Sequence, residues 1–482
     1  MSHSLATPMA QRSAIDRARS ALHLRILALQ KRASEKHRAV MILIGGNDRL
    51  GASELANQLH EWFDARFVRL CAPDLHSAEV TQKPFLWPYW NQVPSQGQLL
   101  IVVGDWVTRT ALSAAQGELS GESLRKRIKG IKNFEETLAD NQIILCKIWI
   151  DTPGKSLKKR LREARKSDAS DWVVTVDDEI LTKSKGHDVA KQIRSSSSGK
   201  GLVWKSINGT EPKHRDLLAG RSIVQQITAG LRRQPTKVRK ANGRPHGLLE
   251  SATKTEPPTK KEYSQQMAKL QNRFGRLSRL AAKRGISTII ALEGVDAAGK
   301  GGVIRRLVAK ADAAHYQVHP TSAPTIEEKN RHYLWRFWNK IPTAGHLAIF
   351  DRSWYGRVMV ERVEGFARTD EWLRAYSEIN HFETQLAEAG DVVLKFWINI
   401  SKEEQLNRFR SREESPHKRH KMTKEDYRNR KNWDLNQRAA EDMIARTDTP
   451  HAPWHVIPGN DKRHARIMVL KAVCRALSDR LD

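Results

Sequence analysis

The feature that most constrains the fold of this chain is an internal repeat with a fixed offset. The segment FLWPYWNQVPSQG, which begins at Phe85, is similar to YLWRFWNKIPTAG, which begins at Tyr333, and 333 − 85 gives an offset of 248 positions. A constant register over more than a hundred residues indicates a tandem duplication, so both halves must be able to form the same fold. Other identical pairs at this offset include Gly46 and Gly294, Asp48 and Asp296, Gly51 and Gly299, Trp106 and Trp354, Lys147 and Lys395, and Arg160 and Arg408.

Each copy alternates helical segments with short apolar runs. In the second copy these runs are STIIALEG (287–294), HLAIFD (346–351) and DVVLKFWINI (391–400), which suit buried parallel strands. Strands separated by helices predict an α/β fold with a doubly wound parallel sheet. The segment 235–260 is rich in Pro, Lys and Thr, so we expect domains at 1–234 and 261–482 joined by this linker.

The second copy contains a candidate phosphate-binding loop directly after its first apolar run. Gly294 to Lys300 has the spacing GxxxxGK, in which small residues let backbone N–H groups approach phosphate oxygens. Lys300 would place its positive charge on the phosphoryl group being transferred. The pattern predicts a P-loop kinase-like domain, although the Ser or Thr that usually follows the lysine is missing. The loop residues predicted to contact phosphate are Gly294, Ala297, Ala298, Gly299, Gly301 and Gly302.

Charged side chains at the end of the second apolar run complete the predicted catalytic set. Asp351 ends this run, where a Walker B carboxylate holds Mg²⁺, and Arg352 and Arg357 can bind phosphate in a planar fork. Asp296 lies inside the loop, where it would repel phosphate unless a divalent cation stood between them. We therefore expect Asp296 and Asp351 to bind Mg²⁺ together. The predicted catalytic residues are Asp296, Lys300, Asp351 and Arg352.

The basic segment LNRFRSREESPHKRHKMTKEDYRNRKNWD, residues 406–434, follows the third apolar run. Its position and charge predict a helical lid that closes over the transferring phosphates, with Arg408 and Arg412 as the phosphate-binding pair. For any other basic residue of the segment, a solvated helical hairpin is the better interpretation. The aromatic residues of 333–338 recur in the first copy, which favours core packing over base stacking.

The first copy keeps the glycines and tryptophans but not the charged groups. Ala52 stands at the position of Lys300, and Val103 and Gly104 replace Asp351 and Arg352. Since phosphoryl transfer depends on these charges, we expect the first domain to be inactive. Its basic runs SLRKRIKGIK and KSLKKRLREARK could still attract a long polyanion.

Composition narrows the partners and the compartment. A formal net charge of +29 predicts an anionic partner, and no apolar run approaches the roughly 18 residues of a membrane span. The N-terminal segment has no apolar core of a signal peptide, so export is not expected. Three scattered cysteines provide neither a metal site nor a disulfide framework, which favours a reducing cytoplasm.

The motifs EGVDAAGKGG, YLWRFWNKIPTAG, IFDRSWYGRVMVERVEGF and TDTPHAPWHVIPGNDKRHAR closely resemble the polyphosphate kinase 2 family over about residues 263–475. The tandem form with a degenerate first copy resembles the family's two-domain class. This resemblance implies Mg²⁺-dependent transfer of a terminal phosphoryl group from inorganic polyphosphate to AMP, giving ADP. It also implies loop roles for Asp296 and Lys300, and related single-domain enzymes pair their subunits. An internal pseudo-dimer of the two domains and a homo-oligomer both remain open.

Three alternatives stay open at this point. A kinase that converts ADP to ATP would differ by one phosphate in the depth of its acceptor pocket, which spacing does not reveal. An ATP-dependent small-molecule kinase would use the same type of loop. A basic nucleic-acid-binding protein with a relic loop would show salt-sensitive binding to random DNA, but no base-reading motif accompanies the charge, so no specific nucleic acid is expected.

Overall fold

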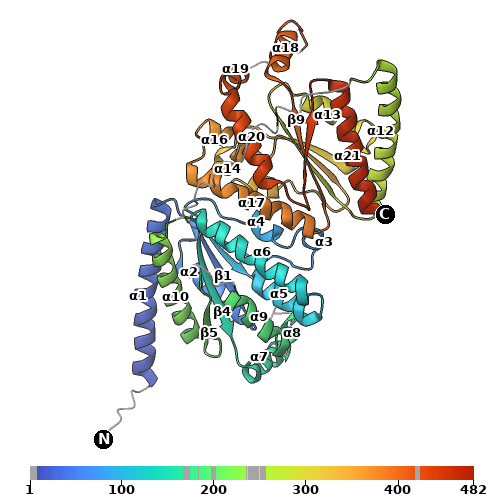
Figure 1. The fold of residues 1–482 in the computed structure, drawn as a ribbon. Helices are drawn as coiled ribbons and strands as arrows, with labels where there is room; N and C mark the ends of the chain where they lie inside the picture. The colour runs from blue at the N-terminus through green and yellow to red at the C-terminus, as the bar shows by residue number, and fades with distance from the viewer. Residues whose placement is uncertain are drawn as a thin grey trace. The chain divides into compact units, whose positions relative to one another are not determined.

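The computed structural model describes residues 8–166, 174–182, 184–196, 202–234, 236, 249, 257–417 and 424–482. It forms two compact units (Figure 1). The first comprises Met1–His76, Pro88–Thr236 and Ile326–His332, and the second Ser77–Trp87, Lys237–Thr325 and Tyr333–Asp482. Most of the expected linker at 235–260 lies outside the described residues. Within the described parts of the chain, no helix is long and apolar enough to cross a membrane.

Each unit contains a five-stranded parallel sheet, so the predicted α/β fold with two copies of a doubly wound domain is confirmed. The strand orders, β2-β3-β1-β4-β5 and β10-β9-β6-β8-β7, are the same connectivity read from opposite edges. The strands of the first unit are β1 (Val40–Gly46), β2 (Val68–Cys71), β3 (Leu99–Val103), β4 (Ile144–Asp151) and β5 (Lys205–Asn208). Those of the second are β6 (Thr288–Gly294), β7 (Tyr316–Pro320), β8 (Leu347–Asp351), β9 (Val392–Asn399) and β10 (Trp454–Pro458).

The three apolar runs of the second copy correspond to β6, β8 and β9, whereas the two edge strands have no such run. Edge strands β7 and β10 have only one or two fully buried residues each and contain polar side chains. A strand with one neighbour does not need the continuous apolar sequence that a central parallel strand needs. Sequence patterning therefore identified only the inner strands.

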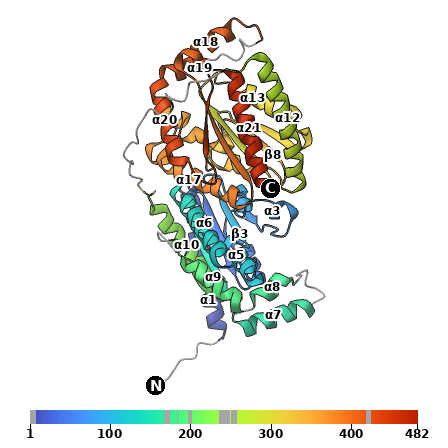
Figure 2. The ribbon, with the colours of Figure 1, turned by 45° about the vertical axis from the view of Figure 1, so that its right-hand side comes forward.

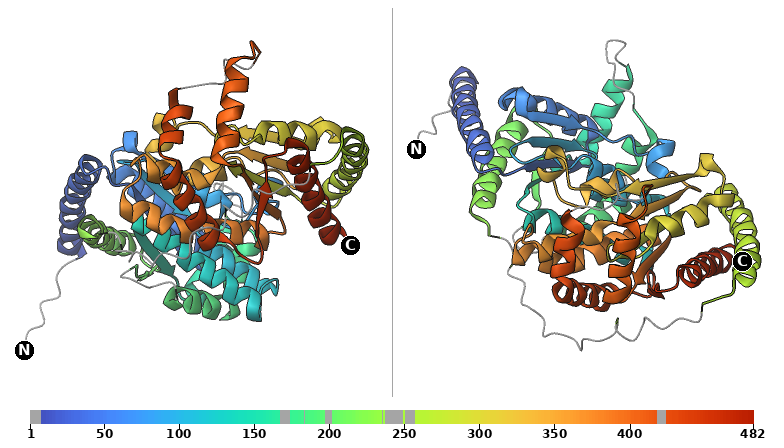
Figure 3. Two further views of the ribbon diagram at one scale, coloured as in Figure 1. Left: turned by 45° about the horizontal axis from the view of Figure 1, so that its top comes forward. Right: turned by 90° about the horizontal axis from the view of Figure 1, so that it is seen from above.

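Helices cover both faces of each sheet (Figures 1 and 2). In the second unit, one face carries α12 (Lys260–Lys283), α13 (Lys300–Leu307) and α21 (Lys462–Leu481), and the other carries α17 (Thr369–Glu388) and α20 (Trp433–Thr447). The C-terminus lies beside α12 in both views of Figure 3, where Arg284 donates to the carbonyl of Leu481. In the first unit the equivalent helices are α1 (Pro8–Glu35), α2 (Arg49–Trp62) and α10 (Pro212–Arg232) on one face, and α5 (Trp106–Gln116), α6 (Gly121–Asp140) and α9 (Ser184–Ser196) on the other.

Alternate residues of the central strands enter two separate cores. Ile290 and Leu292 of β6 pack with α12, α13 and α21, while the opposite face of the sheet carries an aromatic cluster. Trp338 is fully buried in this cluster, with its ring centroid 4.8 Å from that of Phe382, and Phe337 is 3% exposed. The prediction that the aromatic residues of 333–338 form core is confirmed for these two side chains.

A buried ion pair occupies the same place in both units. Lys395 Nζ lies 2.9 Å from the Glu383 carboxylate, and Lys147 Nζ lies 2.7 Å from that of Glu135. All four side chains are 0% or 1% exposed. Because breaking a buried pair leaves an uncompensated charge, both members are retained together.

Candidate active site

The predicted phosphate loop connects β6 to α13 at the carboxyl edge of the second sheet. Gly294 has φ 144°, and a Cβ atom there would lie 2.6 Å from the carbonyl oxygen of Ile398, so only glycine fits. Gly299 has φ 110° and caps α13. Ala297 has φ 61°, an uncommon conformation for a residue with a side chain. Such strained backbone is typical of a site whose geometry serves a ligand.

The first turn of α13 presents unused hydrogen-bond donors. In the part of the chain that the structure describes, the N–H groups of Gly299, Lys300 and Gly301 have no acceptor. A helix N-terminus leaves such donors free and carries a partial positive charge, which favours anions. The loop can therefore bind the oxygens of a phosphate group.

Lys300 is folded back onto the loop that it follows. Its Nζ donates to the carbonyl of Gly294 at 2.8 Å and lies 3.5 Å from that of Val295. Burial, followed by the charge of Arg352, lowers the pKa of Lys300 below its usual range, while nearby carboxylates oppose the shift. A bound phosphate would offset this repulsion and favour the protonated, positively charged form of Lys300.

Asp351 and Arg352 lie next to the loop because β8 pairs with β6. Leu292 of β6 is in register with Asp351, which is partly exposed at the end of β8. Among the described residues, the Asp351 carboxylate accepts no hydrogen bond. Arg352 adopts φ 63°, and its carbonyl accepts a hydrogen bond from Thr321 Oγ1 at 2.8 Å. The structure thus brings Asp351, Arg352 and Lys300 together around one edge of β6.

Asp296 is already engaged by two side chains. Its carboxylate lies 2.6 Å from Arg352 Nη2 and accepts a hydrogen bond from Asn429 Nδ2 at 2.8 Å. Asn429 belongs to α19 (Lys424–Lys431), and Gln405 of α18 (Lys402–Glu413) donates to the carbonyl of Asp296 at 3.2 Å. Figures 1 and 2 show α18 and α19 beyond this edge of the sheet. The two helices of the predicted lid segment therefore contact the loop.

The donor set fits Mg²⁺ bound jointly by protein and phosphate. The described residues contain no group of three or more His, Cys, Asp or Glu side chains suited to a metal ion. Mg²⁺ commonly takes one or two carboxylates and completes its octahedron with substrate phosphates and water. Asp351 has a free carboxylate for this role, whereas Asp296 would first have to release Arg352.

Arg408 differs most from expectation. Its side chain is 4% exposed, and its guanidinium donates to the carbonyls of Ala297, Ala298, Gly459 and Asn460 at 2.6–3.0 Å. Its Nε also lies 2.5 Å from the Glu404 carboxylate. In this structure Arg408 holds the loop from inside the protein, rather than presenting its charge to a phosphate.

Arg357 and Arg412 lie in different surroundings. Arg357 stacks on the ring of Tyr333 at 4.5 Å and pairs with Glu361 at 3.2 Å. Among the described residues, Arg357 forms no hydrogen bond or ion pair with the loop. Arg412 of α18 is partly exposed. Burial lowers the pKa of Arg408, and the nearby charge of Arg412 adds to this shift. No side chain in the described ranges forms an ion pair with Arg412.

Sequence reasoning missed two charged residues at the loop. Glu293 is buried next to Lys300 and accepts hydrogen bonds from Ser353 N and Oγ, both at 2.8 Å. Burial raises its pKa. Arg466 of α21 places Nη2 3.2 Å from where a Cβ of Gly302 would be. The first copy has Gly45 at the position of Glu293. Beyond the last strand the offset becomes 250, since Ile457 pairs with Ile398 as Ile207 pairs with Ile150, and Asp216 therefore stands at the position of Arg466. Comparison of the two copies could have revealed both residues.

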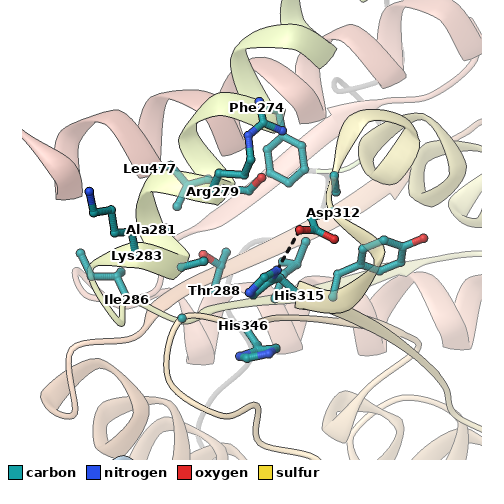
Figure 4. A pocket seen from close by; sticks show the side chains of 16 residues that line it. Phe274, Arg279, Ala281, Lys283, Ile286, Thr288, Asp312, His315, His346 and Leu477 are labelled. Atoms are coloured by element: carbon teal, nitrogen blue, oxygen red, sulfur yellow. Dashed lines mark hydrogen bonds and ion pairs between the residues drawn. The ribbon is translucent and has the colours of Figure 1, made fainter.

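A separate cavity of about 340 Å³ lies at the opposite end of the same sheet (Figure 4). Thr288 and Leu347, the first residues of β6 and β8, line it, together with His315 and His346. In Figure 4, Asp312 forms an ion pair with His315. None of the predicted site residues lines this cavity.

Comparisons with known proteins cover both copies of the repeat. The family model described as Polyphosphate kinase 2 (PPK2) matches residues 9–235 and 258–481. Polyphosphate:AMP phosphotransferase of Pseudomonas aeruginosa is 36% identical over 473 residues, which are 95% of each chain. The protein of the same name from Acinetobacter johnsonii is 37% identical over 463 residues, 93% of each chain.

Shorter relatives and a solved structure extend the comparison. ADP-polyphosphate phosphotransferase 3 of Rhizobium meliloti is 38% identical over 205 residues, 42% of this chain and 72% of that one. A crystal structure from Pseudomonas aeruginosa PA01, ascribed to polyphosphate kinase 2, superposes with a TM-score of 0.86 at 34% identity and covers 100% of this chain and 98% of that one. Both copies of the repeat, and the whole chain in sequence and in fold, match one family: the chain belongs to the polyphosphate kinase 2 family.

Proposed function

We propose that this chain transfers the terminal phosphoryl group of inorganic polyphosphate to AMP, producing ADP and a polyphosphate shortened by one unit. The observation that carries the proposal is the loop of the second unit, where free N–H groups, Lys300 and Asp351 converge. Full-length relatives with the name polyphosphate:AMP phosphotransferase support the choice of donor and acceptor.

The reaction requires positioning and charge neutralisation more than acid–base chemistry. A phosphate oxygen of AMP, already anionic, attacks the terminal phosphorus of polyphosphate, and the bond from that phosphorus to the next bridging oxygen breaks. The N–H groups of Gly299, Lys300 and Gly301 bind the donor phosphates. Lys300 exchanges the carbonyl of Gly294 for the transferred group and compensates its charge.

Mg²⁺ supplies a further positive charge that neutralises adjacent phosphates when it is bound. Asp351 would hold it, since its carboxylate is free among the described residues. Asp296 joins Asp351 if substrate phosphates draw Arg352 away from it. Arg352 would then bind phosphate, so that Asp296 and Arg352 exchange partners when substrate enters.

The first unit lacks these groups and is assigned no chemistry. The chain has three cysteines, none of which forms a disulfide: Cys71 and Cys146 in the first unit and Cys474 in the second. Free cysteines are usual in proteins of a reducing cytoplasm. We place the enzyme there, with polyphosphate and AMP as its partners. A pairing of subunits or of units remains open.

An assay with alternative donors and acceptors tests the proposal. The full chain and a Lys300→Ala variant are incubated with Mg²⁺, AMP or ADP, and either polyphosphate or ATP, and the nucleotides are separated by chromatography. We expect the parent chain to form ADP from AMP and polyphosphate, and the Lys300→Ala variant not to do so. ADP formation only with ATP would indicate an ATP-dependent kinase, and ATP formation from ADP at a higher rate would indicate the diphosphate-specific alternative.

A further inference from the structure

In the first unit, one amide donor at the start of α2 is occupied by the carboxylate of the residue that caps this helix. Asp48, at the position of Asp296, is 1% exposed and accepts a hydrogen bond from the N–H of Gly51 at 2.8 Å. It also accepts one from Thr152 Oγ1 at 2.9 Å and pairs with Arg160 at 3.1 Å. In the second unit the equivalent N–H, that of Gly299, is free among the described residues. The two aspartates thus occupy corresponding positions, but only Asp48 binds a backbone N–H of the following helix, whereas Asp296 binds Arg352 and Asn429.

A second carboxylate in the first unit lies on the second turn of α2. Glu54 is in register with Gly302, since 302 − 54 gives the offset of 248. Its two oxygens lie 2.9 Å from Arg160 Nη2 and 2.8 Å from Arg215 Nη1. The side chain of Arg215 is 1% exposed and also pairs with Asp216. Glu54 therefore binds two arginines in the way that a phosphate group would.

The corresponding turn of the second unit has cations but no carboxylate. Gly302 has no side chain, and a Cβ there would lie 3.2 Å from Arg466 Nη2. Arg466 is within hydrogen-bond reach of Tyr263 Oη, at 3.4 Å, and no acidic side chain of the described residues pairs with it. Arg412, one helical turn beyond Arg408, is likewise without an ion pair in that part of the chain. Glu54 thus supplies an anion at this turn in the first unit, whereas no carboxylate of the described residues does so in the second.

We propose that the first unit's loop is a phosphate site filled from within, in which Asp48 and Glu54 take the place of phosphate oxygens. The internal carboxylates, and not only the loss of the lysine and the strand-end aspartate, keep polyphosphate off this loop. By the same correspondence, a donor phosphate binds the second unit beside Gly302, where Arg466 contacts it. This last step rests on the proposed function of the second unit.

Reciprocal substitutions test the idea in the full chain. In the second unit, Gly302→Glu introduces the carboxylate of the first unit, and Gly302→Gln has the same size without the charge. Gly302 has no positive φ, and its near neighbour is the flexible end of an arginine, so both variants should fold. We expect Gly302→Glu to bind polyphosphate about a hundredfold more weakly than Gly302→Gln. Equal binding by the two variants would overturn the assignment of Gly302.

In the first unit, Glu54→Gly removes the internal carboxylate and recreates the residue of the second unit. Thermal unfolding of the wild type and of this variant is followed with and without pyrophosphate. We expect the variant to have a melting temperature a few degrees lower and to gain more from pyrophosphate than the wild type does. An equal gain in both proteins would overturn the proposal that Glu54 fills a phosphate site.

A wild-type assay for ADP, run alongside, separates this inference from the proposed function. If the wild type makes no ADP from polyphosphate, the proposed function fails, while the pyrophosphate response of Glu54→Gly still reports on the first unit. If the wild type makes ADP and Glu54→Gly shows no extra response to pyrophosphate, only the inference fails.

Discussion

Arg408 gives the sharpest test of how the loop is held. Its guanidinium and Nε form five hydrogen bonds, one to Glu404 and four to backbone carbonyls, two of which belong to the loop residues Ala297 and Ala298. A hydrogen bond to a charged group contributes about 1.5–3 kcal/mol, but these five bonds act as one buried network and do not add. From the cost of breaking a buried charged network, we expect Arg408→Gln to lower the free energy of unfolding by about 3–5 kcal/mol.

Loss of these anchors should also disturb catalysis through the loop. A displacement of about 1 Å at a positioning group costs about a hundredfold in rate, so kcat should fall by that order. The assay combines urea unfolding with steady-state formation of ADP at varied polyphosphate. Arg412→Gln on the same helix is the matched control, and we expect it to keep the stability of the parent and raise KM for polyphosphate. If Arg408→Gln keeps full stability and raises only KM for polyphosphate, Arg408 binds phosphate directly and this account of it is refuted.

Three further predictions follow from particular side chains. Asp351→Asn should raise the Mg²⁺ concentration needed for half-maximal rate by about tenfold or more without lowering the melting temperature; an unchanged Mg²⁺ dependence would remove Asp351 from the metal site. Burial raises the pKa of Asp391 to about 7, so between pH 4 and pH 7 the folded state keeps a proton that the unfolded state releases. The contribution of Asp391 to the free energy of unfolding should therefore fall by about 1.4 kcal/mol for each unit by which the pH rises. Asp391→Asn should make the slope shallower by this amount in urea unfolding, because other buried carboxylates such as Glu293 also contribute to it, and an identical slope in the variant would contradict the assignment. Lys395→Met should cost about 3–5 kcal/mol by leaving Glu383 charged and buried, and adding Glu383→Gln should recover most of it; no recovery would show that packing, not charge, is responsible.

The apolar runs predicted the inner strands because this signal is local, and the repeat extended the prediction from one copy to the other. The runs at 287–294, 346–351 and 391–400 correspond to β6 (Thr288–Gly294), β8 (Leu347–Asp351) and β9 (Val392–Asn399). Each of these strands lies inside a parallel sheet and must be apolar on both faces. The edge strands β7 and β10 contain polar residues and no continuous apolar run, so the hydrophobic pattern did not predict them.

The site was predictable as far as one contiguous motif reaches. The spacing of the motif identifies the glycines of the loop and Lys300, and the position of Asp351 at the end of an apolar run identifies that residue. The partners of Asp296 and Arg408 could not be predicted, because Asn429 and Gly459 are far from them in the sequence. An arginine that binds a phosphate and one that binds carbonyls look the same in a sequence, and only the fold distinguishes Arg408 from Arg412.

The account depends on the charge that Lys300 brings to the loop of the second unit. The most direct measurement is the rate of ADP formation from AMP, polyphosphate and Mg²⁺ by Lys300→Ala, beside the parent chain and with equal melting temperatures verified. Because Lys300 compensates charge on the transferred group, we expect the rate to fall by about a thousandfold or more. A variant that is folded and makes ADP within a few-fold of the parent rate would contradict the assignment of the reaction to this loop.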